Sequence, residues 1–233
     1  MMTIREALEV LAAHRGDRVV ISTMAATGVW RALSDTGLDF AYIPSAMGHG
    51  PGLALGLAMA QPERGVIVVN GDGSTLMNLG SLVTLASHPA NVYILILDNG
   101  LYEVTGGQPV AGAGRTDYTL LAVGAGIERV YTFPDLVSWQ EGAAEALAGP
   151  GPVVIHLPIE GRLGQKTPKP PRPMAEQIAR PPPGKAAGRH FGRAGLAVSG
   201  KSPAFGAGRA AAAARTPTPA ESPRACRWPC PPA

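Results

Sequence analysis

The residues best suited to chemistry are an acidic and an amide side chain that follow two apolar runs of the sequence. Gly71-Asp72-Gly73-Ser74 comes soon after the run at 66–69, and Asn99 comes soon after the run at 92–97. Runs this apolar are typical of strands covered on both faces in a parallel sheet, whose strands end at one common edge. We therefore expect Asp72 and Asn99 to lie close together although 27 positions separate them.

The residue types at this edge indicate a phosphate held through a cation. Gly71 and Gly73 let the backbone turn sharply and approach a ligand closely, and Ser74 with free amides at a helix start can hold a phosphate. Asp72 alone would repel that phosphate, so a cation between them is expected. Asp72 and Asn99 each supply an oxygen, which together with phosphate oxygens makes a typical Mg²⁺ site. An isolated Gly-Asp-Gly is also common in tight turns that bind nothing.

The elements that must position these residues alternate between strand and helix. A capping box at Thr3-Ile4-Arg5-Glu6 predicts a first helix that stops at Gly16. Further helices are predicted at 28–34, 52–60, 76–86 and 136–147, and strands at 19–22, 40–43, 66–69, 92–97, 129–133 and 153–157. This alternation predicts an α/β fold, a doubly wound and mostly parallel sheet with helices on both faces.

The composition divides the chain into two parts. Residues 1–160 are predicted to form one domain, and residues 161–233, with 14 of the 23 prolines, are predicted to be a disordered tail rich in Pro, Ala and Arg. Met174–Arg180 begins like a helix and then meets three prolines. We expect the part after Arg180 to be an extension without a selected function, so that trimming there leaves folding intact.

Charge and cysteine content limit the function classes. The first 160 residues hold 7 Lys/Arg and 15 Asp/Glu, a net charge of −8, which gives no footprint of nucleic-acid binding. No apolar run reaches the roughly 18 residues of a membrane span, and no secretory signal is recognisable. Cys226 and Cys230 are the only cysteines, so a disulfide framework is not expected and a cytoplasmic location is the default.

Gly-Asp-Gly followed by Asn99 resembles the motif of the diphosphate-binding domain of thiamine-diphosphate enzymes. The resemblance implies Mg²⁺ ligands at Asp72, Asn99 and the backbone carbonyl of Leu101. It implies diphosphate contacts around Gly71, Gly73 and Ser74. The family often has Asn-Asn where this chain has Asp98-Asn99.

A second resemblance lies in Ser45-Ala46-Met47-Gly48-His49. In the decarboxylases of this family a bulky apolar residue wedges between the two rings of the cofactor, and Met47 falls in that place. A core methionine is the alternative from the residue alone. The carbonyl of Ser45 would accept a hydrogen bond from the 4′-amino group, and Gly48 flanks the wedge.

Segments 47–49, 78–82, 98–102 and 105–109 are similar to the smaller subunit of sulfopyruvate decarboxylase and to the equivalent part of phosphonopyruvate decarboxylase. The resemblance covers about residues 2 to 160. It implies loss of carbon dioxide from a small, anionic 2-oxoacid, with the cofactor accepting the electrons.

The resemblance also implies roles for residues outside the motif. Tyr102 and Glu103 are candidate cofactor-loop residues, although Glu103 is also consistent with an exposed loop carboxylate. His49, Gln108 and Arg115 are candidate substrate contacts; a helix-capping histidine and an exposed loop arginine are the alternatives. Arg115 is the only Lys or Arg between positions 65 and 128.

The glutamate that activates the cofactor is expected from a separate pyrimidine-domain (alpha) subunit, because no such domain fits before Gly71. Two other functions remain open: an acetolactate-synthase-like carboligase half and a non-catalytic cofactor-binding subunit.

Overall fold

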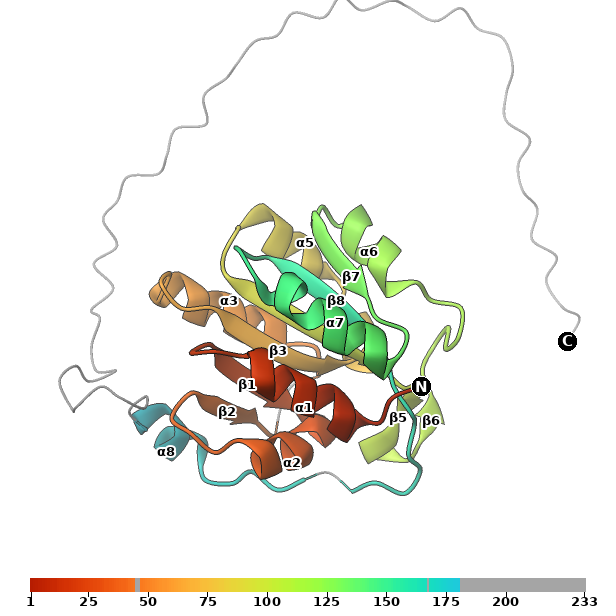
Figure 1. Cartoon of the computed structure of the whole chain (residues 1–233). Coiled ribbons are helices and arrows are strands. Elements are labelled where there is room, and N and C mark those ends of the chain that lie inside the picture. The colour runs from red at the N-terminus through yellow and green to blue at the C-terminus, as the bar shows by residue number, and fades with distance from the viewer. Residues whose placement is uncertain (45–46, 167, 181–233) are drawn as a thin grey trace, which may run out of the picture. The chain divides into compact units, whose positions relative to one another are not determined.

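The computed structural model describes residues 1–44, 47–166 and 168–180. Its centre is a six-stranded sheet of order β2-β1-β3-β4-β8-β7 in which every neighbouring pair is parallel (Figure 1). The strands are β1 (Val19–Thr23), β2 (Asp39–Tyr42), β3 (Val66–Gly71), β4 (Val92–Asp98), β7 (Arg129–Thr132) and β8 (Val153–Pro158). All six coincide with predicted strands to within a few residues at each end.

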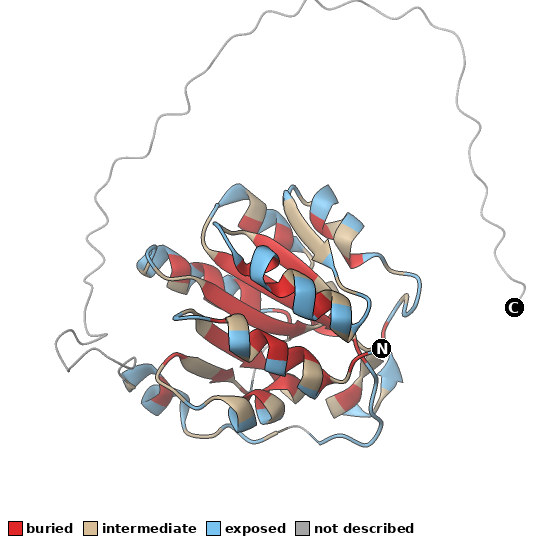
Figure 2. Cartoon of the chain, viewed as in Figure 1, coloured by how far each residue is buried: buried red, intermediate tan, exposed pale blue. Residues whose placement is uncertain are grey.

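Helices cover both faces of the sheet, which confirms the predicted doubly wound fold. One face packs against α1 (Ile4–His14), α2 (Met24–Leu33) and α7 (Leu136–Leu147). The opposite face packs against α3 (Gly50–Ala60), α5 (Gly80–Ser87) and α6 (Tyr118–Gly124). Successive strand residues point to opposite faces, so the apolar runs feed both cores. In β4, Leu95 enters the first core and Ile96 the second, and the central strands are buried along nearly their whole length (Figure 2).

Local chemistry explains where several helices begin. Thr3 and Glu6 form the predicted capping box at the start of α1. Asp117 caps α6 by accepting hydrogen bonds from the amides of Thr119 and Leu120. Sequence reasoning missed α6, although an aspartate before an apolar stretch was a usable signal.

Three local features differ from the predicted elements. The helix expected at 76–86 is split into α4 (Asp72–Met77) and α5, and α2 begins at Met24 rather than at residue 28. A short hairpin of β5 (Leu101–Tyr102) and β6 (Gln108–Pro109), with the 3₁₀ turn η1 (Glu103–Thr105) between them, was not predicted. Two-residue strands carry too little periodicity to be read from sequence.

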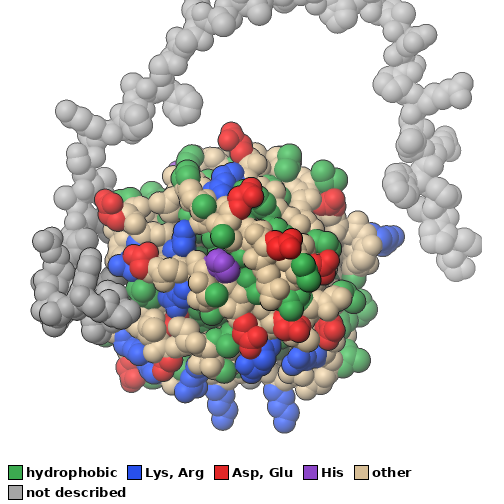
Figure 3. Space-filling model, viewed as in Figure 1, with side chains coloured by type: hydrophobic (Ala, Val, Ile, Leu, Met, Phe, Trp, Pro, Cys, Tyr) green, Lys and Arg blue, Asp and Glu red, His purple; other side chains and the backbone are tan. Residues whose placement is uncertain are grey.

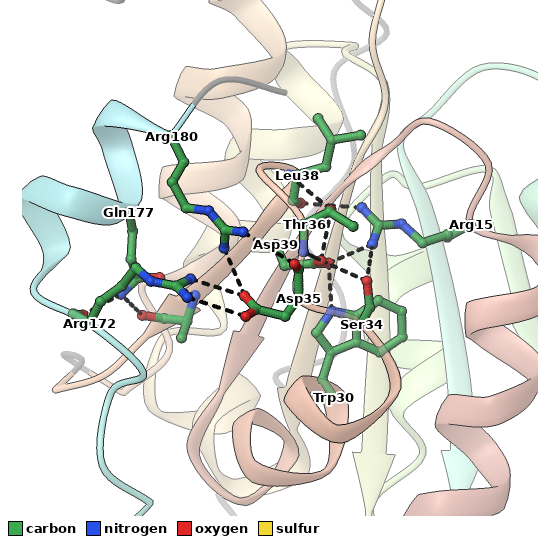
Figure 4. Close-up of polar contacts among 11 residues, drawn as sticks. Arg15, Trp30, Ser34, Asp35, Thr36, Leu38, Asp39, Arg172, Gln177 and Arg180 are labelled. Atoms are coloured by element: carbon green, nitrogen blue, oxygen red, sulfur yellow. Dashed lines mark hydrogen bonds and ion pairs between the residues drawn. The ribbon is translucent and has the colours of Figure 1, made fainter. Parts of the chain in front are cut away.

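The predicted boundary at residue 160 is wrong for the segment that follows. Residues 161–166 and 168–180 pack against the domain, and Met174–Ala179 forms helix α8 beside β2. The side-chain amide of Gln177 accepts from the Ala41 amide at 2.7 Å and donates to the Ala41 carbonyl at 3.3 Å. Arg172 and Arg180 pair with Asp35 (Figure 4). Residues 181–233, the rest of the predicted tail, lie outside the described residues.

A buried polar cluster surrounds Asp39, the first residue of β2. Asp39 accepts hydrogen bonds from the side chains of Arg15, Trp30, Ser34 and Thr36 (Figure 4). Burial opposes ionisation of this carboxyl group, but these hydrogen bonds and the Arg15 charge outweigh it and hold the pKa of Asp39 below its usual value. The cluster fixes α1, α2 and β2 relative to one another.

The surface shows no extended patch of one charge in the view of Figure 3, where acidic and basic side chains are interspersed. In the portion of the chain that the structure describes, none of the helices has the length and apolar character needed to span a bilayer.

Candidate active site

A cleft opens at the carboxyl ends of β1 and β3. From β1 the chain passes through α2 to β2 on one side, whereas β3 leads to β4 on the other, so this is the point where the strand order reverses. Open α/β sheets bind ligands at such a point. The cleft is lined by residues from the end of β1 and the start of α2, from the loop after β2, from the end of β3 and the start of α4, and from the loop after β4. These residues are Thr23, Met24, Ala25, Ala26, Met47, Asn70, Gly71, Asp72, Gly73, Ser74, Asn99, Leu101, Tyr102, Glu103, Val104 and Thr105, together with Ile4, Leu97 and Ile159.

Asp72 is the central polar group of this cleft. It is 2% exposed and accepts a hydrogen bond from the Gly100 amide at 2.9 Å. Among the described residues no Lys, Arg or His forms an ion pair with it. Burial raises the pKa of Asp72 to about 7, and the neighbouring Asp98 carboxylate adds to the rise. A buried carboxylate without a basic partner is stabilised by a bound cation.

The turn after β4 lies directly against Asp72. Gly100 has φ +69°, a conformation that favours glycine, and its amide links the turn to Asp72. The turn is closed by the Leu101 amide, which donates to the Asn99 side-chain oxygen at 2.9 Å, and by the Val110 amide, which donates to the Gly100 carbonyl at 2.8 Å. Asp72 is 27 positions from Asn99 in the sequence, yet it meets Asn99 and Leu101 at one edge of the cleft.

Asp98 and His156 form a second polar layer that sequence reasoning missed. The Nε2 of His156 lies 3.0 Å from one Asp98 oxygen, and the Gly100 amide lies 3.3 Å from the other. Burial opposes ionisation of Asp98, but the hydrogen bond and charge of His156 outweigh it and lower the pKa of Asp98. No local sequence signal joins these two residues, because they are 58 positions apart on different strands.

Gly73 and Ser74 follow Asp72 in α4 and line the cleft, and Ser74 is buried. A Cβ at Gly73 would collide with the Tyr102 ring, so glycine is required for Tyr102 to lie against α4. Asn70 also lines the cleft, and its side-chain oxygen is buried with no hydrogen-bond partner. The cleft thus keeps an unpartnered acceptor for a ligand or water.

The loop after β2 brings one predicted residue to the cleft and leaves another outside. Met47 lines the cleft. Gly48 has φ +81° and packs against Ser74 and Asn78, where a side chain would not fit. His49 is exposed, with its Nδ1 3.2 Å from the Met47 carbonyl, and it does not line the cleft. Ser45 lies outside the described residues.

The remaining predicted residues divide by burial. The alternative of an exposed loop carboxylate is wrong for Glu103, which is 8% exposed, lines the cleft and accepts a hydrogen bond from the Arg162 amide at 2.6 Å. Tyr102 lines the cleft as well. Gln108 and Arg115 are exposed and lie outside the cleft lining. The structure therefore does not gather the three candidate substrate contacts around the cleft.

The donor set fits a small hard cation. Asp72 offers a carboxylate, Asn99 an amide oxygen and Leu101 a carbonyl, which are the ligand types that Mg²⁺ takes together with water and phosphate oxygens. No cluster of three or more His, Cys, Asp or Glu able to hold a metal occurs in the described ranges.

Comparison with known proteins places this site in a family. Residues 20–157 match the family described as thiamine pyrophosphate enzyme, C-terminal TPP binding domain. A phosphonopyruvate decarboxylase of Streptomyces viridochromogenes is 38% identical over 196 residues, 80% of this chain and 49% of that protein. A second, from Streptomyces hygroscopicus, is 44% identical over 119 residues, 51% of this chain and 29% of that protein.

Two further matches agree with these. The sulfopyruvate decarboxylase subunit beta of Methanothermobacter thermautotrophicus is 42% identical over 120 residues, 51% of this chain and 61% of that subunit. A solved structure from Mycobacterium smegmatis, described as a thiamin diphosphate-dependent enzyme, has a TM-score of 0.57 at 24% identity, over 68% of this chain and 32% of that one, and it supports the fold. The chain covers between about a third and three fifths of the length of these relatives. Because the family match spans more than half of its residues, the chain belongs to the thiamine pyrophosphate enzymes as a C-terminal TPP-binding domain.

Proposed function

We propose that the chain is the diphosphate-binding half of a thiamine-diphosphate- and Mg²⁺-dependent 2-oxoacid decarboxylase of the phosphonopyruvate or sulfopyruvate type. The observation that carries the proposal is Asp72, a carboxylate 2% exposed and without a basic partner in the described residues, bonded to the turn that bears Asn99 and Leu101. The names of the three relatives reported above supply the reaction type.

Asp72, Asn99 and the Leu101 carbonyl would hold the Mg²⁺, and Gly71, Gly73 and Ser74 would approach the diphosphate. Met47 would also contact the cofactor, and Ser45, Gly48, Tyr102 and Glu103 would complete its surroundings. When bound, thiamine diphosphate supplies the electron sink for decarboxylation. The residues of this chain then anchor and orient, and none of them needs to transfer a proton.

The proposal includes a partner that completes the active site. Two of the relatives are named as the beta subunit of sulfopyruvate decarboxylase, and the chain matches only part of the longer decarboxylases. The glutamate that activates the cofactor would come from a pyrimidine-domain subunit. That subunit would close the cleft over the cofactor.

The proposed substrate is a small 2-oxoacid with an anionic substituent. Arg115 is exposed and pairs with no carboxylate in the described part of the chain, so it remains available to a substrate or partner. His49 and Gln108 are exposed candidates of the same kind.

The cofactor assignment is tested by calorimetry of the full chain with thiamine diphosphate, with and without Mg²⁺. We expect binding that requires Mg²⁺. Asp72→Asn should weaken it by more than about tenfold, because it removes the only charged ligand. Asp17→Asn, a change at an exposed aspartate, is the matched control. Binding that ignores Mg²⁺, or that survives Asp72→Asn unchanged, would reject the proposal.

A further inference from the structure

We propose that His156 is a positioning residue for the cation site, acting through Asp98 on the turn that carries Asn99 and Leu101. The inference rests on the proposed function, since it concerns the cation of that same site. It adds His156, which lies outside the motif, and gives a role to Asp98, where the family often has asparagine.

Strand pairing explains why His156 and Asp98 meet. His156 on β8 lies opposite Ile96 on β4, two residues before Asp98. Residues two apart in a strand point to the same face of the sheet, so Asp98 and His156 project on the same side of neighbouring strands. His156 Nε2 reaches the Asp98 carboxylate at 3.0 Å, and both side chains are largely shielded, at 13% and 22% exposure.

The histidine ring is itself held from two sides. The ring of Tyr118, a buried residue, lies with its centroid 5.5 Å from that of His156. The Thr132 hydroxyl is 3.5 Å from Nδ1. Nε2 faces the Asp98 carboxylate, which accepts hydrogen bonds, so the ring presents an N–H to Asp98 at this position.

Asp98 transmits this constraint to the ligand turn. Its second carboxylate oxygen accepts from the Gly100 amide at 3.3 Å, and its backbone carbonyl accepts from the Ile159 amide at 2.9 Å. The same Gly100 amide donates to Asp72 at 2.9 Å. One N–H is thus shared by the carboxylate in the cation site and by the carboxylate behind it, and the orientation of Asp98 helps to fix the peptide between two ligands.

Without the histidine, Asp98 would lose the donor that holds one of its carboxylate oxygens beside Nε2. Two carboxylates this close repel, and the free rotation of Asp98 would loosen the turn. Outer-layer partners of this kind change metal affinity by about 10- to 100-fold when removed.

The test is a titration of the full chain with Mn²⁺ in the presence of thiamine diphosphate, with free and bound Mn²⁺ measured by EPR. His156→Gln keeps an amide donor at the place of Nε2, whereas the donor of His156→Asn is too short to reach Asp98. We expect the Mn²⁺ Kd to rise about tenfold or more in His156→Asn and to stay near wild type in His156→Gln. His88→Asn, on an exposed histidine at the end of α5, is the control.

The outcomes separate this inference from the proposed function. Wild-type affinity in His156→Asn, or equal weakening in His156→Asn and His156→Gln, would overturn the positioning role and leave the cofactor assignment standing. If the histidine acted only through its charge, both variants would bind Mn²⁺ as tightly as the wild type or more tightly, which is a different result from the one expected here. Absence of Mn²⁺ binding by the wild-type chain with thiamine diphosphate would overturn the proposed function, and this inference with it.

Discussion

Among single residues, Asp39 gives the clearest link between local chemistry and stability. Its carboxylate forms an ion pair with the almost fully buried Arg15 and accepts hydrogen bonds from three other side chains and from the Thr36 amide. The pKa of Asp39 is lowered in the folded chain, so folding favours the ionised form. Its stabilising contribution is complete above the ordinary aspartate pKa of about 3.9 and is lost as the pH falls through the lower folded value.

We therefore expect the free energy of unfolding to fall as the pH drops below about 4. Asp39→Asn should destabilise the chain by about 3 kcal/mol at pH 7, since it leaves Arg15 buried without its counter-charge, and should flatten this acid-side decline. Urea unfolding followed by circular dichroism between pH 3 and 7 measures both effects. Asp17→Asn should leave the curve unchanged, and an equally steep decline in Asp39→Asn would contradict the assignment.

Among single residues, the motif residues Asp72 and Asn99 could be predicted from the sequence, but the residues that contact the motif from behind could not. Asp72 and Asn99 could be placed together because each ends an apolar strand of a parallel sheet, and the Gly100 hydrogen bond to Asp72 agrees with that expectation. The support from His156 could not be foreseen, because it depends on the register of β4 and β8. The burial of Glu103 could not be foreseen either, because its partner, the Arg162 amide, lies 59 positions later in the sequence.

Between elements, residues 161–166 and 168–180 connect the loop after β4 to α2 and β2. Near the start of this segment, Gly161 packs against Leu101, and the Arg162 amide donates to Glu103. Farther on, Pro168 lies beside Gly28 of α2. At its end Gln177 satisfies both backbone groups of Ala41, on the outer edge of the sheet (Figures 1 and 4). An edge strand covered in this way cannot pair with another chain.

This arrangement predicts different results for two truncations. A chain that ends at Arg180 should match the full chain in stability, whereas one that ends at Glu160 should lose about 2 to 4 kcal/mol, because several hydrogen bonds to buried groups disappear. It should also self-associate through the uncovered β2 edge. Urea unfolding and analytical ultracentrifugation test both expectations. Full-length Gln177→Ala is a milder variant that loses the hydrogen bonds to Ala41 of β2 and to the Arg172 carbonyl. Equal stability of the two truncated chains would show that the segment does not brace the domain.

Local composition explains why this segment was misjudged. Its prolines and arginines and its shortage of apolar residues are typical of disorder. The segment is held by long-range contacts. Arg172 and Arg180 form ion pairs with Asp35, and Gln177 hydrogen-bonds the edge strand β2, more than a hundred residues away in sequence. By contrast, β3 and β4 could be predicted, because a continuous run of apolar residues is typical of a strand buried on both faces.

For the whole molecule, the decisive feature is that the chain covers about half the length, or less, of the phosphonopyruvate decarboxylases it matches. If the pyrimidine-binding domain is a separate subunit, as proposed, the purified chain should bind the cofactor without turning over substrate. Decarboxylation should appear only after addition of that partner, because the proposal puts the group that activates the cofactor on it. Carbon dioxide release from sulfopyruvate, phosphonopyruvate and pyruvate, with and without the partner, measures this directly. Appreciable turnover by the homogeneous chain alone would contradict the proposal that a separate subunit supplies the activating group.

The same assembled system can locate the anion contact. Arg115 is exposed and forms no ion pair with an acid in the described residues, and it is the only Lys or Arg between positions 65 and 128. If it meets the acidic substituent of the substrate, Arg115→Ala should raise KM for the sulfonated or phosphonated substrate about tenfold or more, because a charge-assisted hydrogen bond is worth about 1.5–3 kcal/mol. KM for pyruvate, which lacks that substituent, should change little. Arg31→Ala, at an exposed arginine of α2, controls for the loss of surface charge. An unchanged KM for the dianionic substrate would remove Arg115 from the site and leave His49 or Gln108, or the partner itself, to bind the anion.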